Sequence, residues 1–386
     1  MDIDWRGEAA ALLPELTALR RELHLRPELG NREFETAGRI EACLELWGIE
    51  RRRLLDTAVV GVLRGGRPGG AVALRADMDA LPVEESTGAP FASRTSGVMH
   101  ACGHDFHMAA VLGAARLLAA HREELPGTVK FFFQPDEEGS GGAERMISAG
   151  CMEGPAVEAV FGAHVCPDLP AGTVGVRFGK FYAASDTFEL TLLGKSAHGA
   201  EPEKGIDALA AAAETVQALR ALPGRFPGER CVLSVGTLQA GSAINVIADR
   251  AVLSGILRTL GPDTRRTMKG LLRETVETVA ARWGVRAELT LRESYPGVVN
   301  TDAETELVLR TARSLLGPDR VVELPEPTMT TEDFGYFTQA AAGSFYHIGV
   351  GGKSPLHNPC FLPDDALLAD AAALHAAVAA ARLSGK

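Results

Sequence analysis

The stretch Val129–Gly139 reads VKFFFQPDEEG, and it says more about the fold than any other part of the sequence. Its first five residues form a short apolar run, and the Gln-Pro pair that follows predicts the end of a buried strand and the start of a loop. Residues 157–164 repeat this pattern, and residues 72–77 alternate between the two faces of a third strand. Continuous apolar runs are typical of a sheet that is covered on both faces.

Segments with apolar residues at helical spacing lie between and around these strands. They cover residues 8–24, 34–48 and 109–120, the last with Asp105 as its expected cap, and further along the chain residues 301–316 and 364–383, with a strand at 345–348. Helices that alternate with buried strands predict an α/β fold, with a mostly parallel sheet flanked by helices.

The middle of the chain has a different order of expected strands and helices. Strands are expected at 188–193, 231–239, 250–260 and 285–294, and helices at 206–222 and 262–283. The order β-α-β-β-α-β in about 110 residues is the ferredoxin-like α+β pattern. Residues 186–295 are therefore expected to form an inserted domain, and residues 1–185 and 296–386 the main domain. Residues 179–185 and 295–300 would be the hinges.

Composition and charge exclude several classes of protein. The chain has 386 residues, 46% of them hydrophobic, and 39 basic against 50 acidic residues give a net charge of −11. This balance disfavours nucleic-acid binding, and no uncharged stretch reaches the about 18 residues of a membrane span. The acidic first four residues, with no apolar segment after them, predict no secretory signal. Six cysteines in so long a chain predict reduced thiols, so we expect a cytoplasmic protein.

Residues that bind metals recur where the predicted strands end. The stretches are Arg75–Asp79 (RADMD), His100–His107 (HACGHDFH), Gln134–Gly139, Gly162–His164 and Pro355–Pro359. The carboxyl ends of parallel strands meet at the edge of the sheet where ligands bind. Taken singly, such a histidine is more often a hydrogen-bonded structural residue, and a lone cysteine a small buried apolar one. Dispersed sulfur, nitrogen and oxygen donors together favour a catalytic metal site over a structural zinc site.

These motifs resemble those of the metal-dependent aminoacylase/carboxypeptidase superfamily of amidohydrolases. The most similar branch contains hippurate hydrolases, indole-acetyl-amino-acid hydrolases and N-acetyl-diaminopimelate deacetylases. The stretches that carry the resemblance are Leu74–Pro82, Met99–His107, Gln134–Gly139, Gly194–Pro202, Gly241–Ile247, Glu332–Phe334 and Leu356-His357. They span nearly the whole chain and occur in the family's order. The turn at Gly241–Ile247 departs from the family pattern at Ala248, where proline is usual.

The resemblance implies a role for each matching residue of the main domain, which would be the catalytic domain. The residues that match the metal ligands are Cys102, His104, Glu138, His164 and His357. Glu137 matches the general acid/base, and Asp79 resembles the carboxylate that supports the ligands from behind. The cofactor would be one or two divalent ions per subunit, of zinc, manganese, cobalt or nickel.

In the inserted domain the resemblance implies substrate contacts. His198 would stabilise the oxyanion as a catalytic residue, across a homodimer from the other subunit, whereas Asn245 and Arg258 would bind substrate. Closure of the domain would bring Asn245 and Arg258 of one subunit onto the same substrate molecule. The domain would therefore serve both as a dimerisation domain and as a lid.

The same residue types suit amide hydrolysis on chemical grounds. A metal activates water and polarises the carbonyl group, and one of two adjacent glutamates can bind metal while the other carries the proton. An extended backbone would make the two side chains diverge. The leading hypothesis is a hydrolase of N-acyl amino acids. A dipeptidase or carboxypeptidase with the same site remains open, and so does a non-catalytic dimeric binding protein on the same fold.

Overall fold

The computed structural model describes residues 3–352 and 354–385 and divides the chain into two compact units. Unit 1 contains the residues up to Gly179, Val299–Glu326 and the residues from Asp333 on. Unit 2 contains Lys180–Val298 and Pro327–Glu332. The first two residues, on which part of the argument against a secretory signal rests, lie outside the described residues.

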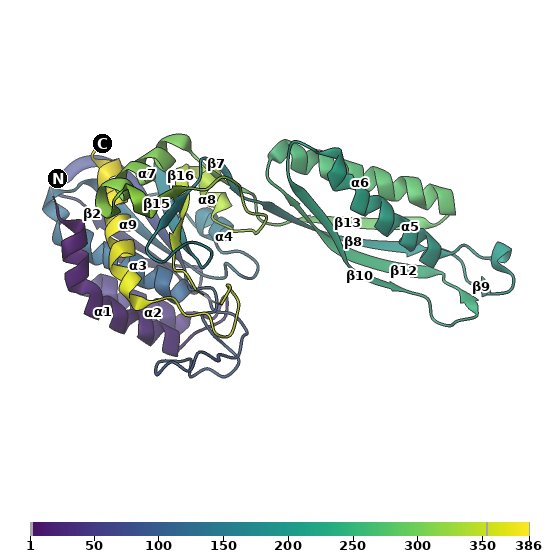
Figure 1. The fold of residues 1–386 in the computed structure, drawn as a ribbon, viewed down its shortest axis with the longest axis horizontal. Helices are drawn as coiled ribbons and strands as arrows, with labels where there is room; N and C mark the ends of the chain where they lie inside the picture. Colours follow the sequence, from purple (N-terminus) through teal and green to yellow (C-terminus); the bar gives the residue numbers. More distant parts are fainter. Residues whose placement is uncertain (1–2, 353, 386) are drawn as a thin grey trace. The chain divides into compact units, whose positions relative to one another are not determined.

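Unit 1 is built on an eight-stranded sheet with the order β1-β2-β4-β3-β5-β16-β6-β15 (Figure 1). The strands are β1 (Glu50–Leu54), β2 (Ala58–Arg64), β3 (Arg67–Asp77), β4 (Pro126–Gln134), β5 (Ala159–Cys166), β6 (Val174–Val176), β15 (Val321–Glu323) and β16 (Ala342–Gly349). The four central strands, β4, β3, β5 and β16, are parallel to one another, as are β6 and β15. The remaining neighbours pair antiparallel. The predicted mostly parallel sheet is confirmed.

Helices cover both faces of this sheet. They are α1 (Trp5–Leu25), α2 (Phe34–Leu46), α3 (His104–Ala120), α4 (Ala143–Ser148), α7 (Asp302–Leu316), α8 (Gly335–Ala340) and α9 (Leu368–Leu383). The apolar run of β4 shows why both faces need cover. Phe131 and Phe133 belong to the core shared with α1, α3 and α9, whereas Phe132 stacks on Phe337 of α8. The consecutive phenylalanines 131–133 are therefore all buried, although they point to opposite faces of the sheet.

Unit 2 is a four-stranded antiparallel sheet with the order β10-β12-β8-β13 and two helices packed on it (Figure 1). Its strands are β8 (Ala184–Leu193), β10 (Cys231–Ala240), β12 (Arg250–Thr259) and β13 (Arg286–Glu293), and its helices are α5 (Ala208–Ala221) and α6 (Pro262–Trp283). The order along the chain is β-α-β-β-α-β, so the predicted ferredoxin-like pattern is confirmed. The sequence analysis missed a short ladder between β9 (Ala197–His198) and β11 (Val246–Ile247). The chain passes between the units at β7 (Gly179–Tyr182) and β14 (Val298–Asn300).

One described helical segment, Asp365–Leu383, is long and apolar enough to cross a membrane by length and composition. Its mean hydropathy is 1.5, and 67% of it is buried in the protein. Almost all of α9 belongs to the core of unit 1, where it packs on α1 and α3. This burial is what a core helix requires, and it explains why the segment is so rich in alanine.

Candidate metal centre

The metal-type residues of unit 1 gather where its parallel strands end. β3 ends at Asp77 and β4 at Gln134, and Asp79 and the pair Glu137-Glu138 follow them directly. His164 lies near the end of β5. His357 lies in the loop after β16, where its backbone N–H donates to Ala101 O at 2.8 Å. Segments far apart in the sequence therefore meet at one edge of the sheet.

Cys102 and His104 lie on either side of Gly103, which precedes α3. Gly103 has a φ of +87°, in the left-handed region that favours glycine. A Cβ at this position would lie 2.6 Å from Val165 Cγ2 of β5. Only glycine therefore lets the turn approach the sheet this closely. The helix begins at His104 with Gly103 at the cap position, so the expectation that Asp105 caps it is wrong: Asp105 lies within the first turn.

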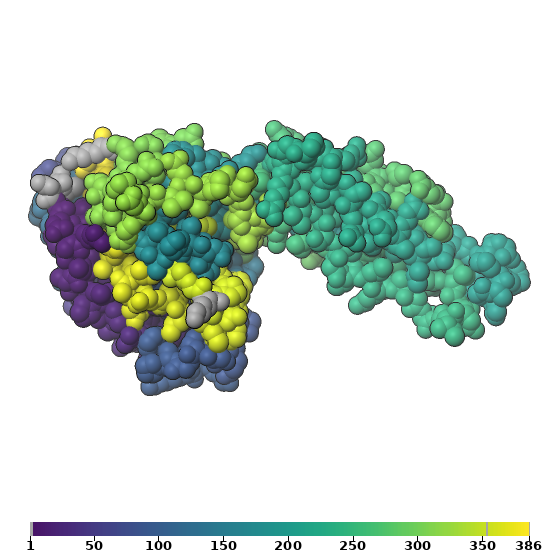
Figure 2. Space-filling model, viewed as in Figure 1, coloured from purple at the N-terminus to yellow at the C-terminus, as the bar shows by residue number. Residues whose placement is uncertain are grey.

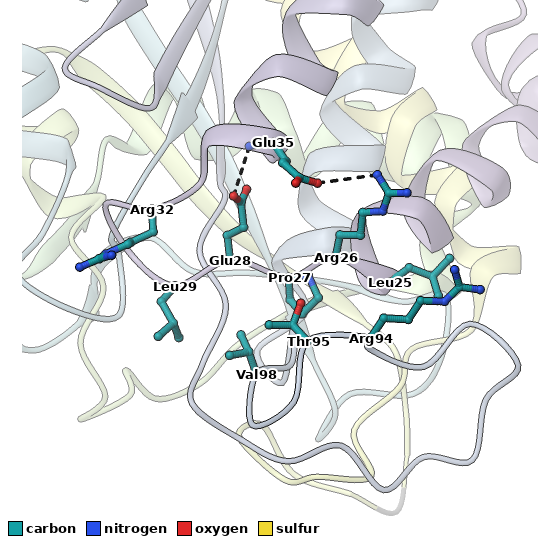
Figure 3. A pocket seen from close by; sticks show the side chains of 10 residues that line it. All are labelled: Leu25, Arg26, Pro27, Glu28, Leu29, Arg32, Glu35, Arg94, Thr95 and Val98. Carbon is teal, nitrogen blue, oxygen red and sulfur yellow. Dashed lines mark hydrogen bonds and ion pairs between the residues drawn. The ribbon is translucent and has the colours of Figure 1, made fainter.

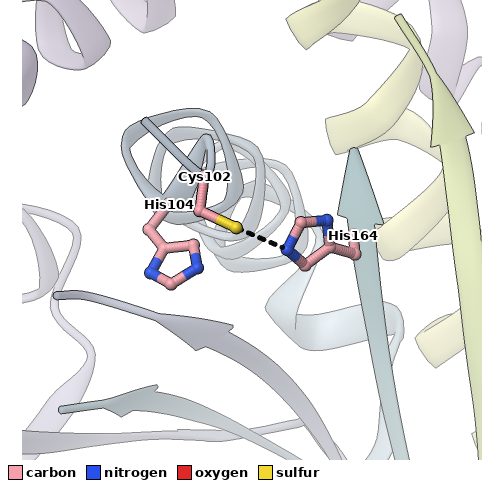
Figure 4. Close-up of side chains that lie close together, drawn as sticks. All are labelled: Cys102, His104 and His164. Atoms are coloured by element: carbon pink, nitrogen blue, oxygen red, sulfur yellow. Dashed lines mark hydrogen bonds between the residues drawn. The ribbon is translucent and has the colours of Figure 1, made fainter. Parts of the chain in front are cut away.

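The five expected ligands form one cluster around the thiol of Cys102. Its Sγ lies 3.3 Å from His164 Nε2 and 3.3 Å from His357 Nε2. Glu138 Oε1 lies 3.0 Å from His357 Nε2 and 4.0 Å from His104 Nε2. Two triads share the cysteine: one with His104 and His164, drawn in Figure 4, and one with Glu138 and His357.

Backbone carbonyls fix how the two buried histidines point. His104 Nδ1 lies 2.8 Å from Asp79 O, and His164 Nδ1 lies 2.8 Å from Val165 O. Since a carbonyl oxygen only accepts, both Nδ1 atoms donate, and Nε2 is the ring atom that carries a lone pair when each imidazole is neutral. Asp79 has a second contact, because its Oδ2 accepts the backbone N–H of Glu138 at 2.9 Å. Asp79 thus holds two members of the cluster, His104 and Glu138, without belonging to either cysteine triad.

The charges around the cluster are mostly negative. Burial lowers the pKa of His104, but Asp77, Asp79 and Glu138 outweigh burial and raise that pKa to about 10. Burial raises the pKa of Glu138, but a hydrogen bond from His357 and the charge of His104 bring it down to about 2. Burial and the charges of Glu138 and Glu137 hold the pKa of the Cys102 thiol well above its ordinary value. A cation placed among these groups would replace the protons that the His104 imidazole and the Cys102 thiol retain.

The donor set fits a divalent metal ion. Among the described residues, the buried Nε2 atom of His104 has no hydrogen-bond partner, which is costly unless something else satisfies it. Two ligand atoms on one tetrahedral ion lie about 3.6 Å apart, given metal bonds of about 2.1–2.3 Å. The spacing of 3.3 Å between Cys102 Sγ and each of its two histidine partners is close to that value. Mixed thiolate, imidazole and carboxylate ligands favour zinc and similar borderline metals.

Glu137 and Glu138 both reach the cluster, with carboxylate oxygens within 4.8 Å of each other and of His104. Asp136, just before them, has a φ of +58°, and residues 137–140 form a turn, so the backbone is not the extended one that would make the two side chains diverge. Glu137 is 7% exposed and lies within reach of His104 and Glu138. Its Oε1 also lies 3.4 Å from the backbone nitrogen of Asp333. The turn lets Glu138 approach His357 while Glu137 stays beside the cluster.

His107 flanks the metal motif and is expected from the sequence to orient the site, and the structure adds its contacts and those of Arg75. His107 donates from Nδ1 to Asp77 at 2.7 Å, and its Nε2 accepts the N–H of Val165 at 2.9 Å. Both of its nitrogens are used, so His107 orients the site rather than binding metal. Arg75 bonds Asp77 and Asp333, each at 2.9 Å. These residues lie in stretches that the sequence analysis singled out, but only the contacts reveal what they do.

The three expected substrate residues lie in unit 2, at two different ends of its sheet. His198 pairs with Val246 in the β9–β11 ladder, and Asn245 O accepts the N–H of Gly199 at 2.7 Å. Arg258 lies on β12 opposite Ser185 and donates to the Ser185 hydroxyl. Figure 2 shows the region of β9 as a projection from the body of unit 2. His198 and Asn245 are exposed, whereas Arg258 is half-buried.

The register of the sheet separates these residues. Arg250 begins β12 at the end from which the β9 and β11 loops extend, and Arg258 lies eight residues further along the strand. At about 3.3 Å per residue this is roughly 26 Å. A small amide substrate does not span that distance. The expectation that Asn245 and Arg258 of one chain reach the same substrate molecule is therefore wrong.

A large surface pocket, of about 740 Å³, lies elsewhere on unit 1. Residues of the segment Leu25–Glu35 line it, together with Arg94, Thr95 and Val98 (Figure 3). Arg26 lies 3.7 Å from Glu35, and the side chains of Arg32 and Arg94 point in opposite directions. The arginines do not converge on one ligand, so this pocket is not a second candidate site.

A largely buried set of sulfur, nitrogen and oxygen donors at the carboxyl edge of an α/β sheet is the arrangement expected of a metal-dependent hydrolase of the amidohydrolase and peptidase class. The profile of peptidase family M20/M25/M40 matches residues 73–380, and the chain belongs to this family. The resemblance inferred from the motifs is thereby confirmed.

Three relatives illustrate the range of the family. An N-acetyl-L-cysteine deacetylase of Bacillus subtilis is 39% identical over 92% of this chain and 85% of its own length. Thermostable carboxypeptidase 1 of Saccharolobus solfataricus is 37% identical over 94% of this chain and 93% of its own length. The crystal structure of the YXEP protein of Bacillus subtilis, a dinuclear metal-binding peptidase of the M20 family, superposes with a TM-score of 0.87 at 37% identity, covering 97% of this chain and 99% of that one.

Proposed function

We propose that the protein hydrolyses the amide bond of N-acyl amino acids with the help of one or two divalent metal ions. The ligands would be Cys102, His104, Glu138, His164 and His357. The observation that carries the proposal is that these donors form two triads with Cys102 in common. A cysteine thiolate shared in this way suits two neighbouring ions, and the metal-binding relative is described as dinuclear.

Bound metal would supply Lewis acidity toward the carbonyl oxygen and acidity to a water molecule. The chain's own residues do the rest. Glu137, buried beside the cluster and outside both cysteine triads, takes a proton from the attacking water and returns it to the leaving amine. Asp79 fixes His104 and the backbone of Glu138, which keeps the cluster in place while the proton moves.

Unit 2 would supply the contacts to the substrate. Arg258 is suited to clamp the free α-carboxylate, because a guanidinium binds a carboxylate with two parallel hydrogen bonds. His198 and Asn245 lie together beyond the Arg250 end of β12, which is about 26 Å from Arg258 along the sheet. In a two-fold dimer, each site would therefore take His198 and Asn245 from one subunit and Arg258 from the other.

The first experiment compares the two glutamates of the pair. Glu137→Gln should retain the metal and lose most of its turnover, by about 10²–10⁴-fold, because it removes the proton carrier. Glu138→Gln should lower the metal content first. Elemental analysis and hydrolysis of N-acetyl and N-benzoyl amino acids are measured on the same preparations. Near-normal kcat in Glu137→Gln would show that Glu137 is not the base.

A carboxypeptidase or dipeptidase activity is the second candidate, and the similarity to a thermostable carboxypeptidase favours it. The same metal site can hydrolyse the amide bond of either kind of substrate. The two activities therefore differ only in which acyl group the enzyme prefers. Comparing kcat/KM for N-acyl amino acids with that for dipeptides separates the two. A protein that binds metal and these ligands but hydrolyses none of them would be a non-catalytic binding protein.

The dimer has its own test. His198→Ala and Glu137→Gln, each inactive alone, are mixed under subunit exchange. Mixed dimers would contain one site with both residues intact, so activity should partly return. Exchange without recovery of activity would show that His198 does not act across subunits. We further propose a cytoplasmic location, since none of the six cysteines forms a disulfide.

A further inference from the structure

Two exposed apolar residues, Ile244 and Val246, flank Asn245 in the projecting part of unit 2 (Figure 2). Ile244 has an exposed fraction of 108%, and Val246 one of 39%. No other large apolar side chain among the described residues is as exposed as Ile244, and the next, Leu46, reaches 79%. A single exposed apolar residue is ordinary on a protein surface. What matters for this apolar pair is its position beside two residues that would contact substrate.

The backbone that carries the apolar pair is a tight turn held in place by its neighbours. The N–H of Val246 donates to Ala243 O at 3.3 Å, so Ile244 and Asn245 are the two central residues of the turn. Asn245 O accepts the N–H of Gly199 at 2.7 Å, and a Cβ on Gly199 would lie 3.0 Å from the Asn245 backbone. Such a turn favours glycine, proline, asparagine, aspartate or serine at its corners. Local structure therefore does not account for an isoleucine there.

Val246 lies directly beside the proposed oxyanion donor. It pairs with His198 in the β9–β11 ladder, and residues opposite each other in an antiparallel pair share a face, with Cβ atoms about 4.5–5.5 Å apart. His198 Nδ1 accepts the N–H of Ala200 at 3.1 Å, so a neutral imidazole carries its proton on Nε2. Nε2 is then the nitrogen that can donate to an oxyanion. A carbonyl group that meets His198 therefore has the apolar pair close by.

We propose that Ile244 and Val246 contact the acyl group of the substrate in the active site of the other subunit, and that they select N-acyl amino acids with a large apolar acyl group. The inference rests on the proposed function, in which His198 and Asn245 act in that site. His198 would contact the carbonyl oxygen, and the acyl chain begins one bond from the carbonyl carbon. The amino acid lies on the other side of the amide, where Arg258 would hold its α-carboxylate. The acyl chain is thus the part of the substrate that the apolar pair reaches first.

The first test uses substrates that share one amino acid and differ only in the acyl group. In the metal-loaded enzyme, Ile244→Ser should lower kcat/KM for the N-benzoyl substrate by about 10-fold or more, because one methylene in an apolar contact is worth about 10–200-fold. It should lower kcat/KM for the N-acetyl substrate by less than about 3-fold, since an acetyl group offers little apolar surface. Serine is a favoured turn residue, so the melting temperature should stay that of the parent.

Two further variants accompany Ile244→Ser. Val246→Thr keeps the branched shape that suits a strand and adds a hydroxyl group, so it should shift the N-benzoyl to N-acetyl ratio in the same direction. Leu46→Ser is the matched control, because Leu46 is also an exposed apolar residue but lies at the end of α2 in unit 1. Its ratio should equal that of the parent enzyme.

The second test places Ile244→Ser on one chain of a mixed dimer. When His198→Ala and Glu137→Gln chains exchange, the recovered activity comes from the site that combines Glu137 of the first chain with His198 of the second. Ile244→Ser on the Glu137→Gln chain should therefore lower the N-benzoyl to N-acetyl ratio of the recovered activity. The same substitution on the His198→Ala chain should leave that ratio at the parent value, because its loop serves the site that lacks both residues.

The outcomes separate this inference from the proposed function. If activity is recovered in the mixed dimer but Ile244→Ser leaves the ratio within about 2-fold of the parent, or shifts it equally from either chain, only the role of the apolar pair is refuted. The same holds if Ile244→Ser instead changes the ranking of N-acetyl amino acids with different side chains, or turns the dimer into monomers in analytical ultracentrifugation. Subunit exchange with no recovery of activity would refute the shared site, and with it this inference.

Discussion

The stability of unit 1 should depend on the charge of His24. This side chain is 1% exposed, with Nδ1 at 3.0 Å from Asp105 Oδ2 and Nε2 at 3.1 Å from Glu85 Oε1. Burial lowers its pKa, but Asp105 and Glu85 outweigh burial and raise the value from 6.5 to about 9. A pKa unit corresponds to about 1.4 kcal/mol, so the charged histidine stabilises the fold by about 3 kcal/mol.

The direction in which stability changes with pH follows from the raised pKa of His24. The stabilisation is fully present below pH 6.5, the value in the unfolded chain, and is lost as the pH rises through about 9. We expect the difference in melting temperature between the parent and His24→Gln to be about 5–10 °C at pH 6 and to shrink toward zero at pH 9.5. Thermal unfolding of both proteins, with metal at the same excess, measures it.

A second buried histidine is the matched control. His375 is 2% exposed, and burial lowers its pKa to about 3, so it is neutral throughout this range, with its Nδ1 2.8 Å from the Tyr346 hydroxyl. His375→Gln should therefore change the melting temperature by the same amount at pH 6 and at pH 9.5. If His24→Gln also changes the melting temperature equally at pH 6 and pH 9.5, the charge of His24 does not stabilise the fold. The inference that Asp105 and Glu85 stabilise a charged His24 is then refuted.

Three further predictions concern the metal site and its support. Gly103→Ala places a Cβ 2.6 Å from Val165 in a left-handed turn, so it should destabilise the protein by about 2–4 kcal/mol and lower its metal content, measured by thermal unfolding and elemental analysis. Removal of metal by a chelator should lower the melting temperature reversibly, because metal binds the folded cluster, and Cys102→Ala should abolish that difference. Asp333→Ala leaves Arg75 buried without one of its carboxylates and should cost about 3–5 kcal/mol, seen in urea unfolding; a loss below 1 kcal/mol would contradict this.

The sequence predicted those elements whose pattern reflects burial. The helix expected at 262–283 has these bounds, because proline begins it and a left-handed glycine at Gly284 ends it. β1 was missed, since its sequence is ERRRL and four of its five residues are exposed at the edge of the sheet. Its register comes from pairing with β2, and no apolar alternation marks it.

The candidate metal site also has one part that the sequence predicts, the metal ligands, and one part that it does not, the residues that support them. Residue types at strand ends indicated a metal centre, because the chemistry of sulfur, nitrogen and oxygen donors can be read from a sequence. The supports could not be read in this way. Arg75 and Asp333 are 258 residues apart in the sequence, and neither side chain indicates by itself that the two form a buried hydrogen bond. Asp136 gave no signal of its left-handed backbone, which arises from contacts with Asn31 and Glu33.

The register of unit 2 bears directly on why a family member of this kind would need two subunits. β8 and β12 run side by side from Leu193 and Arg250 at one end to Ser185 and Arg258 at the other. The chain connects to unit 1 near the Ser185 end, and the loops that carry His198 and Asn245 extend from the opposite end. A rigid antiparallel sheet cannot bring its two ends onto one small molecule. If both ends contact substrate, they must therefore serve different active sites, and a two-fold axis is the simplest arrangement in which each site receives one end from each chain.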